Sequence, residues 1–160
     1  MLNYRSLTAA DDAALASIIR TSLEQMHLNL PGTAYSDPEL DHLSAYYARE
    51  PKKRTYFVAL DDAGQVVGGV GVAEFAPIPN CAEIQKLYLS NAVRGKGYSK
   101  ELMRLAKTWA KEAGYRQLYL ETHSNLQIAI KLYKKLGFTE IERPKEVLHS
   151  TMDHFYIKRL

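Results

Sequence analysis

The chain has 160 residues, 46% hydrophobic and 24% charged, which suits one domain with an apolar core. Its net charge of +3 favours an anionic ligand but is too small for a typical nucleic-acid-binding surface. The single cysteine, Cys81, excludes an internal disulfide and a four-cysteine zinc site. No apolar run approaches the roughly 20 residues that span a bilayer, and the N-terminus lacks a signal-peptide pattern. We therefore expect one cytoplasmic domain over residues 1–160, without a membrane partner.

The chain is predicted to begin with a short strand and two helices. Residues 4–7 suit the strand, and a helix capped by Thr8 or Asp11 is expected to run to about Leu28. A second helix is expected after Asp37, with the following proline in its first turn.

The middle of the chain predicts a hairpin, a third strand and a long helix. Residues 55–61 and 66–75 suit antiparallel strands, and 83–89 suit a further strand. Residues 99–113 have helical periodicity. The expected inward face carries Leu102, Ala106, Trp109 and Ala113, and the opposite face carries Lys100, Arg104, Lys107 and Lys111. This basic stripe suits a solvated helix face, and a nucleic-acid-binding face is the alternative.

The C-terminal part predicts three more strands, at 117–122, 138–141 and 152–160, and a helix over 125–136. Ser124 and Gln127 have the spacing of a capping box. The expected fold class is α/β of the mixed α+β kind. Its mixed, mostly antiparallel central sheet should have about six to seven strands, with helices on both faces.

The segment VRGKGYSKELM, residues 93–103, places a glycine-rich turn directly before the long helix. The first N–H groups of a helix lack partners, and glycine lets a ligand approach the backbone closely. Arg94 and Lys96 add positive charge, so the turn suits a phosphate cradle, and an ordinary glycine turn is the alternative. The Walker A pattern and the third glycine of a dinucleotide fingerprint are both absent.

This turn resembles motif A of the GNAT superfamily of N-acyltransferases, and the resemblance extends over nearly the whole chain. The matching residues are Arg94, Gly95, Lys96, Gly97, Tyr98 and Ser99, with Ser99 in place of the usual Gly or Ala. The resemblance implies the GNAT fold, with the loop binding the pyrophosphate of acetyl-CoA. It also implies that pantetheine pairs with the backbone of Leu87 and Leu89.

Residues 124–141 resemble the family's motif B. The resemblance implies that Asn125 contacts the pantetheine arm, with Ala129 beside the cofactor. Helix capping is the alternative role for Asn125. The resemblance makes Tyr133 the general acid that protonates the leaving thiolate, whereas the alternative is a core tyrosine bonded to a backbone group.

An amine acceptor needs a base, because an alkyl amine is mostly protonated at neutral pH. Glu83 is the candidate base, and Gln85 shares its strand face and is expected at the substrate. An exposed strand-end carboxylate and catalysis by ordered water alone are the alternatives. In the resemblance, residues 29–50 bind the acceptor, which makes Tyr35 and Asp37 candidate substrate contacts, with Tyr46 and Tyr47 as further candidates.

A metal site and a nucleophilic cysteine are not expected. His149, Asp153 and His154 are close in sequence, but neighbouring strand residues point to opposite faces, so no metal is expected. Cys81 precedes Glu83 but has no histidine nearby in sequence, so it lacks the base that would activate its thiol.

The resemblance implies an N-acetyltransferase that moves an acetyl group from acetyl-CoA directly to a primary amine, with a small-molecule acceptor expected. A non-catalytic acyl-CoA-binding module and an acetyltransferase of protein N-termini or lysines remain alternatives. No nucleic-acid partner is expected. Dimers are common in that family, so a homodimer is one expected assembly.

Overall fold

The computed structural model describes all 160 residues, and its seven strands form one sheet in the order β1-β2-β3-β4-β5-β7-β6. The strands are β1 (Asn3–Ser6), β2 (Thr55–Leu60), β3 (Val66–Glu74), β4 (Cys81–Leu89), β5 (Gln117–Thr122), β6 (Thr139–Ile141) and β7 (His154–Arg159). The helices are α1 (Asp12–Gln25), α2 (Leu43–Ala48), α3 (Tyr98–Glu112) and α4 (Gln127–Lys135). Only the β4–β5 pair is parallel, so the predicted element order and the mostly antiparallel sheet are confirmed.

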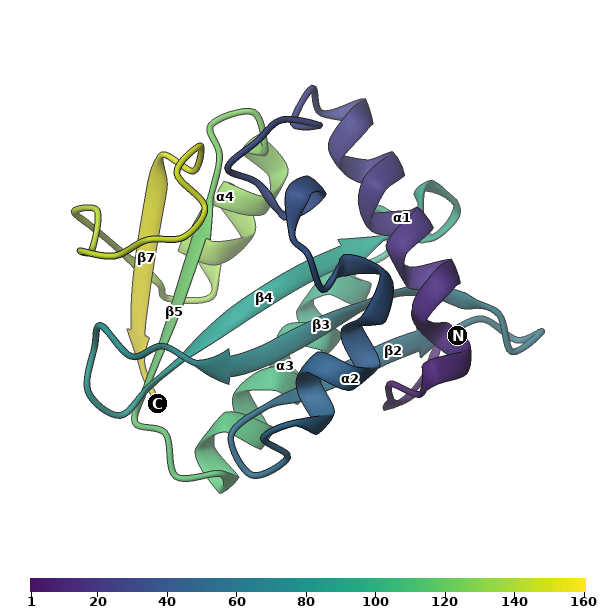
Figure 1. Ribbon diagram of the computed structural model, residues 1–160, viewed down its shortest axis with the longest axis horizontal. Helices are drawn as coiled ribbons and strands as arrows, with labels where there is room; N and C mark the ends of the chain where they lie inside the picture. The colour runs from purple at the N-terminus through teal and green to yellow at the C-terminus, as the bar shows by residue number, and fades with distance from the viewer.

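The helices cover both faces of the sheet (Figure 1). Helices α1 and α2 pack on one face, where α1 buries Leu15, Ile19 and Leu23. Helices α3 and α4 pack on the other face, where α3 buries Leu102, Met103, Ala106 and Ala110. The expectation that Ala113 lies inward is wrong, because α3 ends at Glu112 and Ala113 is exposed. No helix has both the length and the apolar character needed to cross a membrane.

Strands β4 and β5 diverge, which determines where a ligand can enter the sheet. They pair only between Cys81–Glu83 and residues 117–119, and Figure 1 shows them separating beyond that point. The edge of β4 beyond Glu83 therefore faces no neighbouring strand on the β5 side. Helices α3 and α4 both begin shortly after the diverging ends of these strands.

A bulge interrupts β4 at Lys86 and Leu87. Gln85 pairs with Gly71 and Tyr88 pairs with Gly69, so two residues of β4 oppose Val70 of β3. Lys86 has a φ of 48°, and its carbonyl accepts a 2.8 Å hydrogen bond from the Tyr56 hydroxyl. The bulge changes which side chains share a face. Gln85 and Tyr88 face the α1–α2 side, whereas Ile84, Leu87 and Leu89 face the α3 side.

The second helix begins later than predicted, because the carboxylate of a residue distant in sequence caps it. Two 3₁₀ turns, Ala34–Ser36 and Leu40–His42, precede α2. Asp12 of α1 accepts hydrogen bonds from the backbone N–H of Ser44 at 2.9 Å and from its hydroxyl at 2.6 Å. This cap in the first turn of α2 comes from the other helix of the same layer.

The capping box predicted at the start of α4 is wrong. The hydroxyl of Ser124 donates to Asp153 at 2.8 Å, and Leu126 occupies the N-cap position without a side-chain cap. Asp153 follows Ser124 by 29 residues, so the Ser124 hydroxyl makes a tertiary contact, while the side-chain amide of Gln127 donates to the Ser124 carbonyl.

Candidate active site

The glycine loop before α3 presents backbone N–H groups at a helix N-terminus. Gly97 is the N-cap residue with φ 84°, Gly95 has φ 75°, and no side chain caps the helix. A Cβ at either glycine would meet no atom within 4 Å, so positive φ is what requires glycine here. The free N–H groups and the helix dipole favour an anion at this point.

The side chain of Arg94 forms its hydrogen bonds within the protein. Its Nε donates to the Leu89 carbonyl at 2.8 Å, and one terminal nitrogen donates to the Ser22 hydroxyl at 2.9 Å. Arg94 therefore ties the loop to the end of β4 and to α1. Lys96 remains an exposed charge on the loop, and Tyr98 and Ser99 form the first, half-buried residues of α3.

Tyr133 is buried in α4, and its hydroxyl makes no hydrogen bond to the protein. Its ring packs against Phe138 and Tyr156, with centroids 6.1 and 6.2 Å away. Burial raises the pKa of the phenol to about 12, so it keeps its proton at neutral pH. No backbone group accepts a hydrogen bond from this phenol, contrary to the alternative of a core tyrosine bonded to a backbone group. The role of general acid stays a prediction.

Asn125 precedes α4, and Ala129 lies in its first turn, in the same helix as Tyr133. The side-chain amide of Asn125 donates to the Met26 carbonyl at 3.1 Å, which links the start of α4 to the end of α1. Asn125 precedes the N-cap Leu126, so helix capping does not account for it. Ala129 packs against the hydrophobic core that contains Tyr133.

Glu83 is held on the α1–α2 side of β4 by a short relay of hydrogen bonds. Gln85 Nε2 donates to Glu83 Oε1 at 2.7 Å, and the Tyr47 hydroxyl donates to Gln85 Oε1 at 2.8 Å. Burial, and next the negative charge of Glu121, raise the pKa of Glu83 to about 7. The description of Glu83 as an exposed strand-end carboxylate is therefore wrong, and the group can gain or lose a proton near neutral pH.

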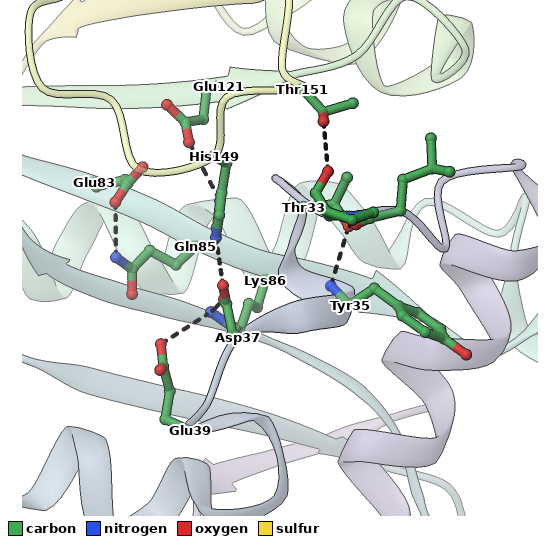
Figure 2. Close-up of polar contacts among 12 residues, drawn as sticks. Thr33, Tyr35, Asp37, Glu39, Glu83, Gln85, Lys86, Glu121, His149 and Thr151 are labelled. Atoms are coloured by element: carbon green, nitrogen blue, oxygen red, sulfur yellow. Dashed lines mark hydrogen bonds and ion pairs between the residues drawn. The ribbon is translucent and has the colours of Figure 1, made fainter.

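A second polar cluster lies beside Glu83 (Figure 2). Asp37 contacts Lys86 Nζ and His149 Nε2, each at 2.7 Å, and Glu39 lies 3.9 Å from Lys86 Nζ. The other ring nitrogen of His149 lies 3.3 Å from Glu121 Oε1. Burial lowers the pKa of His149, but its hydrogen bonds to Asp37 and Glu121 outweigh that effect and raise it to about 9.

Tyr35 is not part of this cluster. Figure 2 shows its ring directed toward α1, where the hydroxyl donates to Glu24 at 2.8 Å. Of the expected substrate contacts, the structure brings Asp37 and Gln85 close to Glu83, and it directs Tyr35 elsewhere.

Sequence reasoning missed Glu121 and the contacts of His149. The alternation along 117–122 places Tyr119 and Glu121 on one strand face, a signal that could have marked Glu121. No local pattern could connect His149 with Asp37, which lies 112 residues earlier.

Asp153, His154 and Cys81 lie outside this cluster. Asp153 accepts from Ser124, and His154 lies 2.7 Å from Glu140. Cys81 is buried, which raises the pKa of its thiol to about 12 and disfavours a nucleophilic thiolate.

Comparisons with known proteins show the family to which this chain is related. A family model described as "Acetyltransferase (GNAT) family" matches residues 20–138. The uncharacterised N-acetyltransferase YjgM of Escherichia coli K12 is 38% identical over 140 residues, covering 86% of this chain and 82% of that protein. A GNAT-family acetyltransferase from Staphylococcus aureus Mu50 has a TM-score of 0.87 at 19% identity, covering 100% of this chain and 99% of that one. A phosphinothricin acetyltransferase from Sinorhizobium meliloti, solved with acetyl-CoA, has a TM-score of 0.78 at 24% identity, covering 99% and 88%.

Proposed function

Because the chain belongs to the acetyltransferase (GNAT) family and is an acyltransferase, we propose that it moves an acetyl group from acetyl-CoA directly to a primary amine of a small molecule. The observation that carries the catalytic role is the hydroxyl of Tyr133, which makes no hydrogen bond within the protein although the residue is largely buried. A module that only binds acyl-CoA would not require a phenol that is free to donate its proton.

In this proposal the cofactor enters where β4 and β5 diverge. The pyrophosphate lies on the backbone N–H groups of the loop at Gly95–Gly97 and of the first turn of α3, with Lys96 adding charge. Pantetheine extends along the edge of β4 at Leu87 and Leu89, near Asn125 and Ala129. The missing strand partner on this side of β4 supports that route.

Glu83 and Tyr133 then divide the proton transfers. Glu83 takes a proton from the acceptor ammonium, directly or through a water, and the free amine attacks the thioester carbonyl. Backbone N–H groups at the β4 bulge stabilise the tetrahedral oxyanion. The C–N bond forms first, and the nitrogen then loses its second proton to water. The C–S bond of the tetrahedral intermediate breaks, and Tyr133 gives its proton to the departing thiolate and later regains one from water. Binding both substrates in one cleft supplies part of the acceleration.

The packing beside Glu83 favours a small acceptor over a protein. The segment 142–153 between β6 and β7, here called the strap, covers residues 31–37. Thr151 donates from its N–H to the Gly32 carbonyl at 3.0 Å and from its hydroxyl to the Pro31 carbonyl at 2.7 Å. These contacts and the pair between His149 and Asp37 hold the strap against residues 31–37, a packing that suits a small amine.

Release of the CoA thiol tests the proposal against its alternatives. The purified protein and acetyl-CoA are incubated with a panel of small amines, amino acids and peptides that carry free N-termini or lysines. We expect amine-dependent thiol release with at least one small amine. Release with the peptides alone would support the protein acetyltransferase instead. Binding of acetyl-CoA without release across the panel would support the non-catalytic module.

A further inference from the structure

Glu83 has a second carboxylate beside it that the proposed reaction does not use. Glu83 is in register with Tyr119 on the neighbouring parallel strand, and Glu121 follows two residues later on the same face. The Glu121 side chain is only 8% exposed, and it accepts a 2.8 Å hydrogen bond from the Tyr119 hydroxyl. A buried negative charge is therefore fixed next to the candidate base.

His149 supplies the opposing charge from the strap. Its Nε2 lies 2.7 Å from Asp37 and its Nδ1 lies 3.3 Å from Glu121. With a carboxylate oxygen at each ring nitrogen, the imidazolium is the form that both contacts favour. Figure 2 shows the His149 ring between Glu121 and Asp37, linked to each of them.

The other groups that face Glu83 cannot replace this pair. Lys86 of β4 is already paired with Asp37 at 2.7 Å. The phenols of Tyr47 and Tyr119 and the thiol of Cys81 all have raised pKa values, chiefly through burial, so they stay neutral at pH 7. Glu121 and His149 are therefore the charged neighbours that β5 and the strap place beside Glu83. They also pair with each other at 3.3 Å, so replacing either one leaves the charge of the other near Glu83.

We propose that Glu121 and His149 are positioning residues that set how readily Glu83 accepts a proton, with Glu121 strengthening the base and His149 moderating it. The inference rests on the proposed function, in which Glu83 is the base. A like charge nearby disfavours an ionised carboxylate and an opposite charge favours it, by about 1–3 pH units at close range. Because His149 belongs to the strap, the segment that packs on residues 31–37 also affects the pH range in which Glu83 accepts a proton.

Carbon-13 NMR of the glutamate carboxyls tests this without any acceptor. The Glu83 signal, identified by its loss in Glu83→Gln, is followed against pH in the wild type and in three variants. His149→Gln keeps hydrogen-bonding groups but removes the charge, and we expect it to raise the Glu83 midpoint by about one pH unit. Glu121→Gln is expected to lower the midpoint by about the same amount. His154→Gln is the matched control, because His154 also pairs with a glutamate at 2.7 Å but lies on β7, and no change is expected.

The opposite directions separate an electrostatic role from a structural one. Unchanged Glu83 midpoints in both variants, or shifts in the same direction, would overturn the inference. A purely structural role of His149 and Glu121 would not move the midpoints of the two variants in opposite directions. If His149→Gln does not fold, Glu121→Gln decides alone: a lowered midpoint supports the inference and an unchanged one contradicts it. The titration does not depend on turnover. Full activity of Glu83→Gln in a separate assay would therefore refute the role of Glu83 as the base, and the titration result would still hold.

Discussion

The opposite acid–base roles proposed for Glu83 and Tyr133 are consistent with their surroundings. Glu83 lies near Glu121 and receives a hydrogen bond from Gln85, and its pKa is close to 7. Tyr133 lies in an apolar layer without a partner, and its pKa is about 12. At neutral pH one group can accept a proton while the other can only donate one, as a base and an acid in one site require.

Tyr133→Phe tests the acid role, because it removes one hydroxyl and keeps the ring that packs on Phe138 and Tyr156. We expect kcat to fall by about a hundredfold or more, the usual contribution of a general acid, with the Kd for acetyl-CoA unchanged. Steady-state kinetics and calorimetry measure the two quantities. A variant with wild-type kcat would remove Tyr133 from the reaction.

Glu83→Gln tests the base role through the pH profile. In the wild type, kcat/KM should rise as pH increases through about 7, because Glu83 loses its proton there. The variant should lack this limb. The loss of kcat/KM relative to the wild type should become smaller at higher pH, where the acceptor amine is already deprotonated. A variant that keeps the wild-type profile would point to ordered water as the base.

At the residue scale, strand alternation placed Glu83 and Gln85 on one face, and the structure joins them by a hydrogen bond. Asp37 was proposed from the resemblance, and it contacts Lys86 and His149 beside them, while the roles of all three stay predictions. Sequence reasoning could not find His149 or Glu121 as partners, because their contacts join β5, the strap and residues 31–37. Such contacts depend on the order of strands in the sheet, which spacing does not specify.

At the scale of elements, the glycine loop is where sequence and structure agree most closely. Its position between β4 and α3 was predicted, as was the need for small residues. Arg94 was expected to face the ligand, but it is bonded to Leu89 and Ser22. The bulge in β4 was not predicted, because a non-glycine residue, Lys86, adopts φ 48° there.

Gly97→Val should abolish acetyl-CoA binding, since a side chain at φ 84° strains the N-cap and lies where the phosphates approach. Gly64→Val is a matched control. Gly64 has φ 79° with no atom within 4 Å of a Cβ, but lies in the turn between β2 and β3. Both variants should lose roughly 1–2 kcal/mol of stability. Calorimetry should show lost binding in the first only, and equal binding in both would contradict the cradle.

The ion pairs of His149 in the strap should stabilise the folded protein below about pH 9. The folded-state pKa of His149 is raised above its ordinary value of 6.5 to about 9. Its contribution to stability is therefore fully present below about pH 6.5 and is lost as pH rises through about 9.

Melting curves check this contribution. The Tm of His149→Gln should lie below that of the wild type at about pH 6 and converge with it at about pH 10. A Tm difference for His149→Gln that stays constant over this range would show that the ion pairs add no stability.

At the scale of the whole molecule, the divergence of β4 and β5 organises the site. It leaves an edge of β4 without a strand partner, between the layer of α1 and α2 and the layer of α3 and α4. The glycine loop lies between the end of β4 and α3, and Tyr133 lies in α4, which follows the end of β5. Glu83 is the last residue of β4 that pairs with β5. The order of elements was predictable, but the extent of pairing between β4 and β5 was not, because both strands continue as regular apolar sequence.

The central claim is that this opening binds acetyl-CoA through its phosphates, and calorimetric titration tests it most directly. The purified protein is titrated with acetyl-CoA and with S-acetylpantetheine, which keeps the thioester and lacks the phosphates. We predict clear binding of acetyl-CoA and binding of S-acetylpantetheine that is weaker by about a hundredfold or more, a loss of about 2.7 kcal/mol. Equal affinity for the two would contradict the phosphate cradle, and binding of neither would contradict the whole account.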